Sequence, residues 1–215
     1  MNYNEKRRKT RALRVGRLTM GGTAPILIQS MTNTDTHDRE ATLAQVRALA
    51  AAGCDVVRLT VPDAAAAETI RYLKGELPEV PLVADIHFDY RAALAAAEAG
   101  VDKIRINPGN IGEEARVRAV VEACKAREIP IRIGVNGGSL EKHILAKHGA
   151  PTAEALCESA FYHVALLEKY GFFDIAISVK SSDVATMIAA NRLVAAACDY
   201  PLHLGVTEAG GRAKL

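Results

Sequence analysis

Tryptophan is missing from this 215-residue sequence, and aromatic residues of all kinds make up only 5% of it. Long apolar runs are missing too. None approaches the ~20 residues that a membrane-spanning helix needs, so we expect no membrane span. The first residues, MNYNEKRRKTRALRVGR, have no apolar segment after their charges and therefore do not resemble a secretory signal. Together these absences indicate a cytoplasmic protein.

Cysteine is scarce, and its four copies lie far apart, at positions 54, 124, 157 and 198. No CxxC motif occurs, and each cysteine lies in or beside an apolar helical stretch. This pattern favours buried, reduced thiols over a metal or cluster site within the chain.

The charge is nearly balanced overall, at +2, but it is unevenly distributed. Residues 1–17 hold seven Lys or Arg residues against one acidic residue. A basic segment of this kind can contact nucleic acid, but Tyr3 is its only aromatic residue. We therefore interpret residues 1–24 as a solvated or locally docked basic arm, with no nucleic-acid partner.

The rest of the chain alternates between strand-like and helix-like segments. Apolar strand candidates lie at 25–31, 55–61, 81–87, 102–107, 130–136, 174–180 and 201–207. Alanine-rich helical segments lie between them, at 39–52, 63–77, 89–99, 113–128, 152–170 and 183–198. Repeated βα units of this kind predict a parallel sheet covered by helices.

Two parallel architectures are compatible with such units. A doubly wound sheet usually has a GxGxxG turn after its first strand and a single switch point for ligands. Neither is visible, and seven successive units exceed its usual count. We therefore predict an α/β fold of the TIM-type (β/α) barrel, with functional residues at the C-terminal ends of the strands.

We expect this barrel to be incomplete. Seven of eight βα units are recognisable, and the sequence stops at GRAKL directly after the seventh strand candidate. A closed barrel takes ~250 residues as a rule, and an open sheet exposes edges that invite aggregation. We interpret residues 25–215 as a barrel domain truncated before its last strand.

Polar residues occupy only one face of the predicted strands. In the strand at 102–107, Lys103, Arg105 and Asn107 alternate with Ile104 and Ile106. Six strands share this arrangement, which places the aliphatic face against the helices and the polar face in the barrel lumen. The polar residues near the strand ends are Arg58, Asp85, His87, Arg105, Asn107, Arg132, Asn136 and Lys180.

Four cations converge at the mouth of this lumen: Arg58, Arg105, Arg132 and Lys180. They repel one another unless negative charge joins them, and Asp85 and Glu208 can neutralise about two. An internal ion-pair network is one explanation. An anionic ligand, with phosphate or diphosphate oxygens held by forked guanidinium groups, is favoured.

Three glycine-containing loops at strand ends agree with an anion site: NPGN (107–110), NGGS (136–139) and EAGG (208–211). Glycine lets backbone N–H groups approach an anion closely. His87 is a candidate hydrogen-bonding residue or proton donor. Glu208 is a candidate acid/base or hydroxyl-orienting group.

Two alternatives remain open on the residues alone. Lys180, at the end of the sixth strand, has the position of a Schiff-base lysine in an aldolase of the barrel class. The chain can also be a non-catalytic diphosphate-binding module.

Strand-end motifs carry a resemblance to a known family: QSMTNT (29–34), VRLTVP (57–62), VADIHFDYR (83–91), RINPGNIG (105–112), IRIGVNGGSLE (131–141), SVKSSD (178–183) and PLHLGVTEAGG (201–211). In this order they resemble the 4-hydroxy-3-methylbut-2-en-1-yl diphosphate synthases of the non-mevalonate isoprenoid pathway. The resemblance covers nearly the whole chain from about residue 5.

The resemblance implies an iron–sulfur oxidoreductase that reductively opens the ring of 2-C-methyl-D-erythritol 2,4-cyclodiphosphate and removes water. It implies a [4Fe–4S] cluster, a reduced flavodoxin or ferredoxin as electron donor, and a homodimer. By the same resemblance Arg58, Arg105, Arg132 and Lys180 bind the diphosphate. The resemblance also implies that four polar residues lie around the substrate: Asp85, His87, Asn107 and Asn136. It implies that Glu208 lies near a substrate hydroxyl.

The sequence departs from this family in one respect. The family's cluster ligands lie in a C-terminal iron–sulfur domain, and nothing in this sequence corresponds to that domain. We therefore expect the chain alone to be inactive and to lack the broad absorption band of an iron–sulfur cluster.

Overall fold

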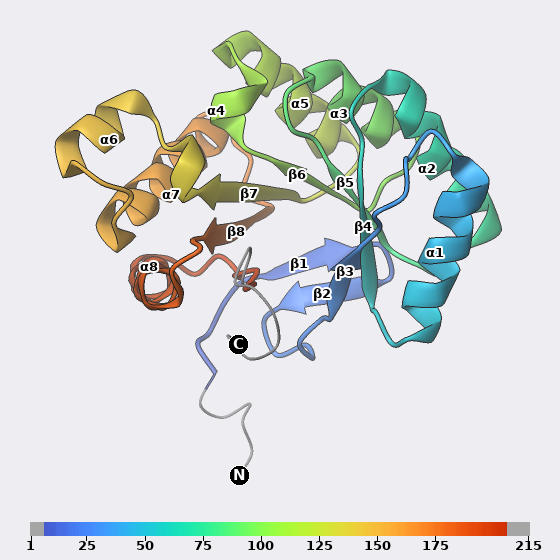
Figure 1. Ribbon diagram of the computed structural model, residues 1–215, viewed down its shortest axis with the longest axis horizontal. Coiled ribbons are helices and arrows are strands. Elements are labelled where there is room, and N and C mark those ends of the chain that lie inside the picture. The colour runs from blue at the N-terminus through green and yellow to red at the C-terminus, as the bar shows by residue number, and fades with distance from the viewer. Residues whose placement is uncertain (1–6, 206–215) are drawn as a thin grey trace.

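The computed structural model describes residues 7–205, which are built around a parallel sheet (Figure 1). Its six strands follow in sequence order: β3 (Gln29–Met31), β4 (Val56–Thr60), β5 (Leu82–Asp85), β6 (Lys103–Ile106), β7 (Ile131–Asn136) and β8 (Ile175–Lys180). Every neighbouring pair is parallel. The sheet curls into part of a barrel, which confirms the predicted (β/α) architecture.

Helices cover the convex face of this sheet (Figure 1). They are α1 (Arg39–Ala51), α2 (Ala64–Glu76), α3 (Tyr90–Glu98), α5 (Glu114–Ala126), α7 (Ala153–Glu168) and α8 (Val184–Ala197). Two short helices, α4 (Pro108–Ile111) and α6 (Lys142–His148), and a 3₁₀ turn, η2, at Gly137–Ser139, lie in the connections that follow β6 and β7. The carboxylates of Asp38, Asp63 and Asp183 cap α1, α2 and α8 by accepting a backbone N–H three residues on. All six predicted helices are present, with ends within two residues of the predicted ones.

The seventh predicted strand, 201–207, is only partly described. Leu202 forms a single parallel bridge with Ile177 of β8. Two backbone hydrogen bonds support it: Ile177 donates to the Pro201 carbonyl at 3.0 Å, and His203 donates to the Ile177 carbonyl at 2.8 Å. Within the described residues this segment therefore continues the sheet beside β8 without forming a full strand.

A β-hairpin lies in the region that the sequence indicated only as an arm. Strand β1 (Ala12–Val15) pairs antiparallel with β2 (Leu18–Gly21) around a turn at Gly16, whose φ is +57°. The hairpin's apolar side chains pack near the starts of β4 and β5, in a cluster of Val15, Leu18, Met20, Leu27, Val56 and Val83. We call this group the floor cluster, because Val56 and Val83 belong to the concave face of the sheet. It lies at the end of the lumen where β4 and β5 begin, opposite the strands' C-terminal ends.

The basic residues before the hairpin are docked onto the end of α8. Arg8 donates to the carbonyl oxygens of Ala195 (3.2 Å), Cys198 and Tyr200 (2.5 Å), two of which belong to the residues just after the helix. Arg11 pairs with Asp199, and its guanidinium lies 4.0 Å from the centre of the Tyr200 ring. The arm, from residue 7 on, is therefore locally docked.

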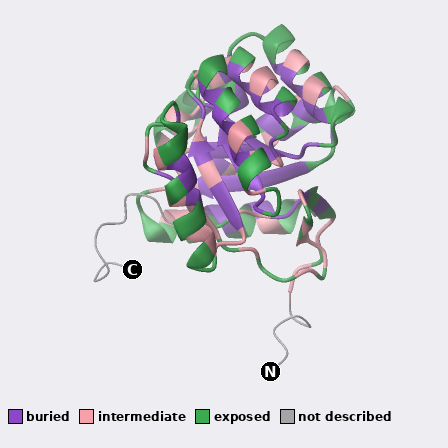
Figure 2. Ribbon diagram, turned by 90° about the vertical axis from the view of Figure 1, so that its right-hand side faces the viewer, coloured by how far each residue is buried: buried purple, intermediate pink, exposed green. Residues whose placement is uncertain are grey.

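The convex face of the sheet forms the main hydrophobic core. The buried strand residues facing the helices are all aliphatic, for example Leu59, Ile104, Ile133 and Ile177, each with no exposed surface. Figure 2 shows the buried strands beneath helices whose outer surfaces are exposed. None of the helices in residues 7–205 is long and apolar enough to cross a bilayer.

Candidate functional site

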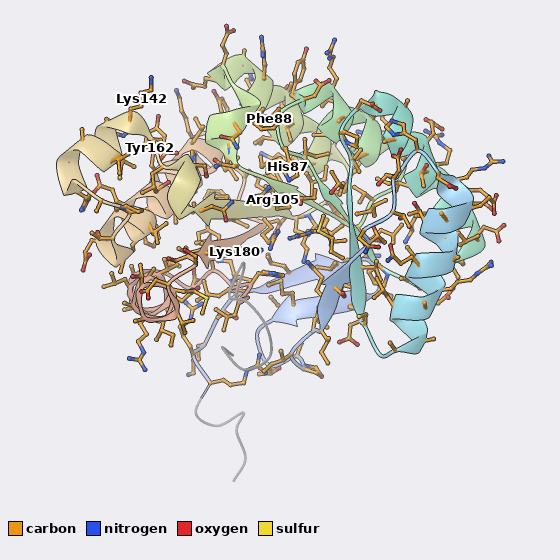
Figure 3. All side chains as sticks on the ribbon, viewed as in Figure 1. His87, Phe88, Arg105, Lys142, Tyr162 and Lys180 are labelled. Atoms are coloured by element: carbon orange, nitrogen blue, oxygen red, sulfur yellow. The ribbon has the colours of Figure 1, made fainter. Side chains whose placement is uncertain are left out.

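A cavity of about 620 Å³ opens at the C-terminal ends of the strands, on the concave face of the sheet. The predicted site residues that line it are Arg58, Asp85, His87, Arg105, Arg132, Asn136 and Lys180. They come from β4 to β8, so alternation along five successive strands brings them together. Figure 3 shows His87, Arg105 and Lys180 on this side of the curled sheet.

Asp85 is the only carboxylate among the described residues lining the cavity, and it lies at the centre of a group of cations. Arg105 donates from Nη1 to Asp85 Oδ1 at 3.0 Å. Arg58 Nε and His87 Nε2 lie 3.6 Å and 3.3 Å from the other oxygen, Oδ2. One carboxylate is thus shared by two guanidinium groups and an imidazole.

Arg132 is buried among these cations, and no acidic side chain of residues 7–205 pairs with it. Its side chain is 1% exposed, and among the described residues neither Nε nor Nη1 has a hydrogen-bond partner. Burial, reinforced by the charges of Arg58 and Arg105, lowers its pKa to about 9. A buried guanidinium with free donors is costly unless an anion satisfies it.

Lys180, at the end of β8, experiences the same excess of positive charge. Burial is the main cause that lowers its pKa, to about 8, and the neighbouring arginines add to it. Burial likewise lowers the pKa of Arg58. Arg58 also directs Nε and Nη2 at the Met31 sulfur, at 3.1 and 2.8 Å, and a thioether is only a weak acceptor. The electrostatics of the cavity therefore favour a multivalent anion.

Gly134 of β7 makes room for the Arg105 side chain. A Cβ atom built on Gly134 would lie 2.4 Å from Arg105 Nε, closer than any real contact allows. The close approach, and not an unusual backbone angle, favours glycine here, because any larger residue would have to displace the Arg105 guanidinium. Gly134 therefore helps to hold the Arg105 guanidinium in the position where it meets Asp85.

Asn107, predicted to contact the ligand, is 2% exposed and does not line the cavity. Its Oδ1 accepts from the Gly109 N–H at 3.1 Å and so caps α4. Its Nδ2 donates to the Ser139 hydroxyl at 3.2 Å. In this structure its amide joins the loop after β6 to the η2 turn after β7.

A pair formed by a buried histidine and a partly exposed glutamate lies beside these two loops. His163 of α7 places Nε2 at 2.6 Å from Oε1 of Glu141, the residue that precedes α6. Burial opposes ionisation of Glu141, but the nearby His163 and Ser159 side chains outweigh it and lower its pKa to about 2. A Cβ on Gly109 would lie 3.2 Å from the Glu141 carboxylate and 3.3 Å from the His163 ring. This pair therefore supports the loop carrying Asn107, and no pattern in the sequence indicated it.

Several cavity residues were not among the predicted ones. Ser178 and Ser139 add hydroxyl groups, and Phe88, 72% exposed, lies at the rim (Figure 3). Ser178 shares the face of Lys180 two residues earlier, so strand alternation was a signal that could have found it. Glu208, the predicted acid/base residue, lies outside the described residues, as does the EAGG loop.

Comparison with known proteins identifies relatives over nearly the whole chain. Residues 10–214 match the family described as the GcpE TIM-barrel domain. Proteins named 4-hydroxy-3-methylbut-2-en-1-yl diphosphate synthase (flavodoxin) from Bacillus cereus, Bacillus thuringiensis and Bacillus anthracis are each 57% identical to it. Each match covers 98% of this chain and 56% of the relative, so the chain spans about half the length of these relatives.

Solved structures share the fold at low sequence identity. A type I 3-dehydroquinate dehydratase from Clostridium difficile superposes with a TM-score of 0.68 at 14% identity, covering 93% of this chain and 81% of the other. A spore coat polysaccharide biosynthesis protein from Bacillus subtilis reaches 0.58 at 16% identity, covering 80% and 49%. At these identities the likeness establishes only the barrel-type fold.

Proposed function

This chain belongs to the GcpE TIM-barrel family, and on that premise we propose that it is the substrate-binding barrel of a 4-hydroxy-3-methylbut-2-en-1-yl diphosphate synthase. The substrate in this proposal is 2-C-methyl-D-erythritol 2,4-cyclodiphosphate. The complete enzyme opens its ring with two electrons and removes water. The name that the relatives carry is the first support for this assignment.

The observation that carries the proposal is the excess of buried positive charge around the cavity. Arg58, Arg105, Arg132 and Lys180 surround one carboxylate, and Arg132 has unused donors. A cyclic diphosphate brings two negative charges and several acceptor oxygens. One planar guanidinium group can bind two such oxygens at once. The cavity volume of about 620 Å³ also suits a small, compact substrate.

The roles follow from position. The three arginines and Lys180 bind the diphosphate, and Asp85 orients Arg58 and Arg105 toward it. The His87 side chain is 46% exposed and lies beside Asp85, so it can donate a proton to the bound ligand. Asn136 contributes an amide at the rim. Glu208 is proposed to assist proton transfer at a substrate hydroxyl.

An iron–sulfur cluster supplies reducing electrons in the proposed reaction, but the described residues of this chain do not fit one. Cys124 is buried in α5, where burial raises its pKa to about 12, which disfavours the thiolate that a cluster needs. Within residues 7–205, no group of three or more potential ligands gathers to hold a metal. The roles proposed for this chain are therefore binding, orientation and proton transfer alone.

For the complete protein we propose a cytoplasmic homodimer that receives electrons from reduced flavodoxin or ferredoxin. Flavodoxin is part of the relatives' names, which supports this donor class. We expect this chain without further polypeptide to bind substrate but not to turn it over.

Calorimetric titration of the chain with the cyclic diphosphate tests the proposal. Replacing Arg105 or Arg132 with alanine removes a forked phosphate contact, so binding should weaken by about 1.5–3 kcal/mol. Arg118→Ala is the matched control, because Arg118 pairs with Glu122 on the exposed side of α5. Equal affinity of all four proteins, or no binding by the folded wild type, would refute the proposal.

A further inference from the structure

Lys103 is a fifth lumen cation that none of the proposed roles uses. It is the first residue of β6 and lies on the concave face two residues before Arg105. Its partner across the β5–β6 ladder is Val83, a member of the floor cluster. Lys103 thus lies between the apolar floor of the lumen and the arginines at its mouth, with only 2% of its surface exposed.

The surroundings of Lys103 disfavour an ammonium ion. No acidic side chain of residues 7–205 lies within ion-pair distance of it. Arg132, Arg58 and the imidazole of His203 face it, and Asp85 is already engaged by the arginines. Burial, followed by the charges of Arg132 and Arg58, lowers its pKa to about 7. Much of the lysine is therefore neutral slightly above neutral pH.

Lys103 nevertheless has access to the ligand region. It lines a second cavity, of about 500 Å³, which shares Arg58 and Lys180 with the candidate site. An anion that binds to the shared cations adds negative charge beside Lys103. Such a charge favours the protonated amine, because opposite charges in a low-dielectric interior attract strongly.

We propose that Lys103 is a further substrate-binding residue, which takes up a proton from solvent as the diphosphate enters. The resulting ammonium group then lies between the floor cluster and the bound anion. This inference rests on the proposed diphosphate-binding function. Above about pH 7, ligand binding therefore adds a positive charge at Lys103 that the empty lumen largely lacks. No covalent step is involved, and the proton comes from the buffer.

The pH dependence has a definite sign. The amine has a low pKa in the free protein, and the bound dianion raises it. Between about pH 7 and the raised pKa, binding takes up a proton, so affinity falls as pH rises. Below pH 7 Lys103 is already protonated and contributes no such dependence. Lys180 titrates near pH 8 and contributes a smaller part of the uptake there.

Titration calorimetry of the full chain at pH 8, in two buffers of different ionisation enthalpy, measures this uptake. The probe is the cyclic diphosphate, whose two phosphorus acids are strong and do not titrate near pH 8. We expect Lys103→Met to take up about one proton fewer per ligand than the wild type, with a correspondingly flatter affinity profile above pH 7. Lys147→Met is the control, because Lys147 of α6 is an exposed lysine that pairs with Glu158, and neither residue lines the two cavities.

The outcomes separate this inference from the proposed function. Equal proton uptake by wild type and Lys103→Met, with binding retained, overturns the role of Lys103 and leaves the diphosphate site intact. No binding by the wild type overturns both. If Lys103→Met does not fold, the ¹³Cε resonance of Lys103 in the wild type decides. Its titration midpoint should rise from near 7 by at least one pH unit on ligand addition, and an unchanged midpoint overturns the proposal.

Discussion

The two faces of the curled sheet are made by the same strands and yet have opposite chemistry. On the convex face, residues such as Leu59, Leu82 and Ile133 are fully buried and wholly aliphatic. On the concave face, Arg105, Arg132 and their neighbours are buried around Asp85, the one carboxylate that lines the cavity within residues 7–205. Successive residues of one strand therefore face either the hydrophobic core or the group of cations.

This difference separates what stabilises the fold from what binds the ligand. Burying aliphatic side chains is favourable in every state of the protein. Burying several cations is unfavourable until an anion neutralises them, and it is retained where function requires it. Mutations on the convex face should therefore change mainly the free energy of unfolding. Mutations on the concave face should change mainly the affinity for the ligand.

The largest effect is expected on the convex face. Leu82→Ala removes a fully buried side chain at the start of β5, far from the cavity mouth. The free energy of unfolding, measured by urea titration, should fall by about 2–5 kcal/mol. Affinity for the cyclic diphosphate, measured where the variant is folded, should stay within about twofold of the wild type. A tenfold loss of affinity would show that the two faces are not independent.

Arg132→Met should behave in the opposite way. Binding should weaken by about 1.5–3 kcal/mol, because a forked phosphate contact is lost. The free energy of unfolding should be unchanged or higher, because a buried cation with unsatisfied donors is replaced by an apolar side chain of similar length. A loss of stability comparable to that of Leu82→Ala would mean that Arg132 serves the fold.

Gly134→Ala tests the concave face through shape alone. The new Cβ would collide with Arg105 and displace its guanidinium from Asp85, so affinity should fall by about tenfold, or roughly 1.4 kcal/mol. Gly75→Ala is the control, since Gly75 lies in α2 with nothing within 4 Å of an added Cβ. That variant should gain slightly in stability. Unchanged affinity in Gly134→Ala would indicate that Arg105 does not contact the ligand.

The smallest effect concerns the Glu141–His163 pair beside the loops. The pKa of Glu141 is lowered to about 2 in the folded protein, so its contribution to stability is fully present above the unfolded value of about 4.5. It is lost as pH falls from there toward 2. Glu141→Gln should cost about 1 kcal/mol in the free energy of unfolding at pH 7, and this difference should shrink by pH 3. A difference independent of pH would contradict an ionised Glu141.

Much of the fold could be predicted from the sequence because the pattern is local. Alternation of Ile with Arg and Lys along β6 and β7, together with glycine after helices, indicated the strands of the parallel sheet and six of the helices near their observed places. The short helices α4 and α6 were not predicted. The hairpin at residues 12–21 could not be predicted in this way. Its strands are four residues long, and its burial depends on contacts with Val56 and Val83, which are remote in sequence.

The site was predictable to the extent that it depends on strand phase. Arg58, Arg105, Arg132 and Lys180 line one cavity as their alternation indicated. Asn107 does not line that cavity, because its side chain at the strand end caps the next helix, and its contact with the ligand stays a prediction. The Glu141–His163 pair could not be predicted, because it joins two segments through a contact that no periodic pattern in the sequence indicates.

Thermal unfolding with and without the cyclic diphosphate tests most directly whether the concave face is an anion site. A ligand that neutralises the buried cations must stabilise the folded state, by about 2.7 kcal/mol at a concentration of 100 Kd. We predict an unfolding midpoint that rises with ligand concentration for the wild type and stays constant for the Arg105→Ala, Arg132→Ala double variant. A wild-type midpoint that does not move at millimolar ligand would contradict the account.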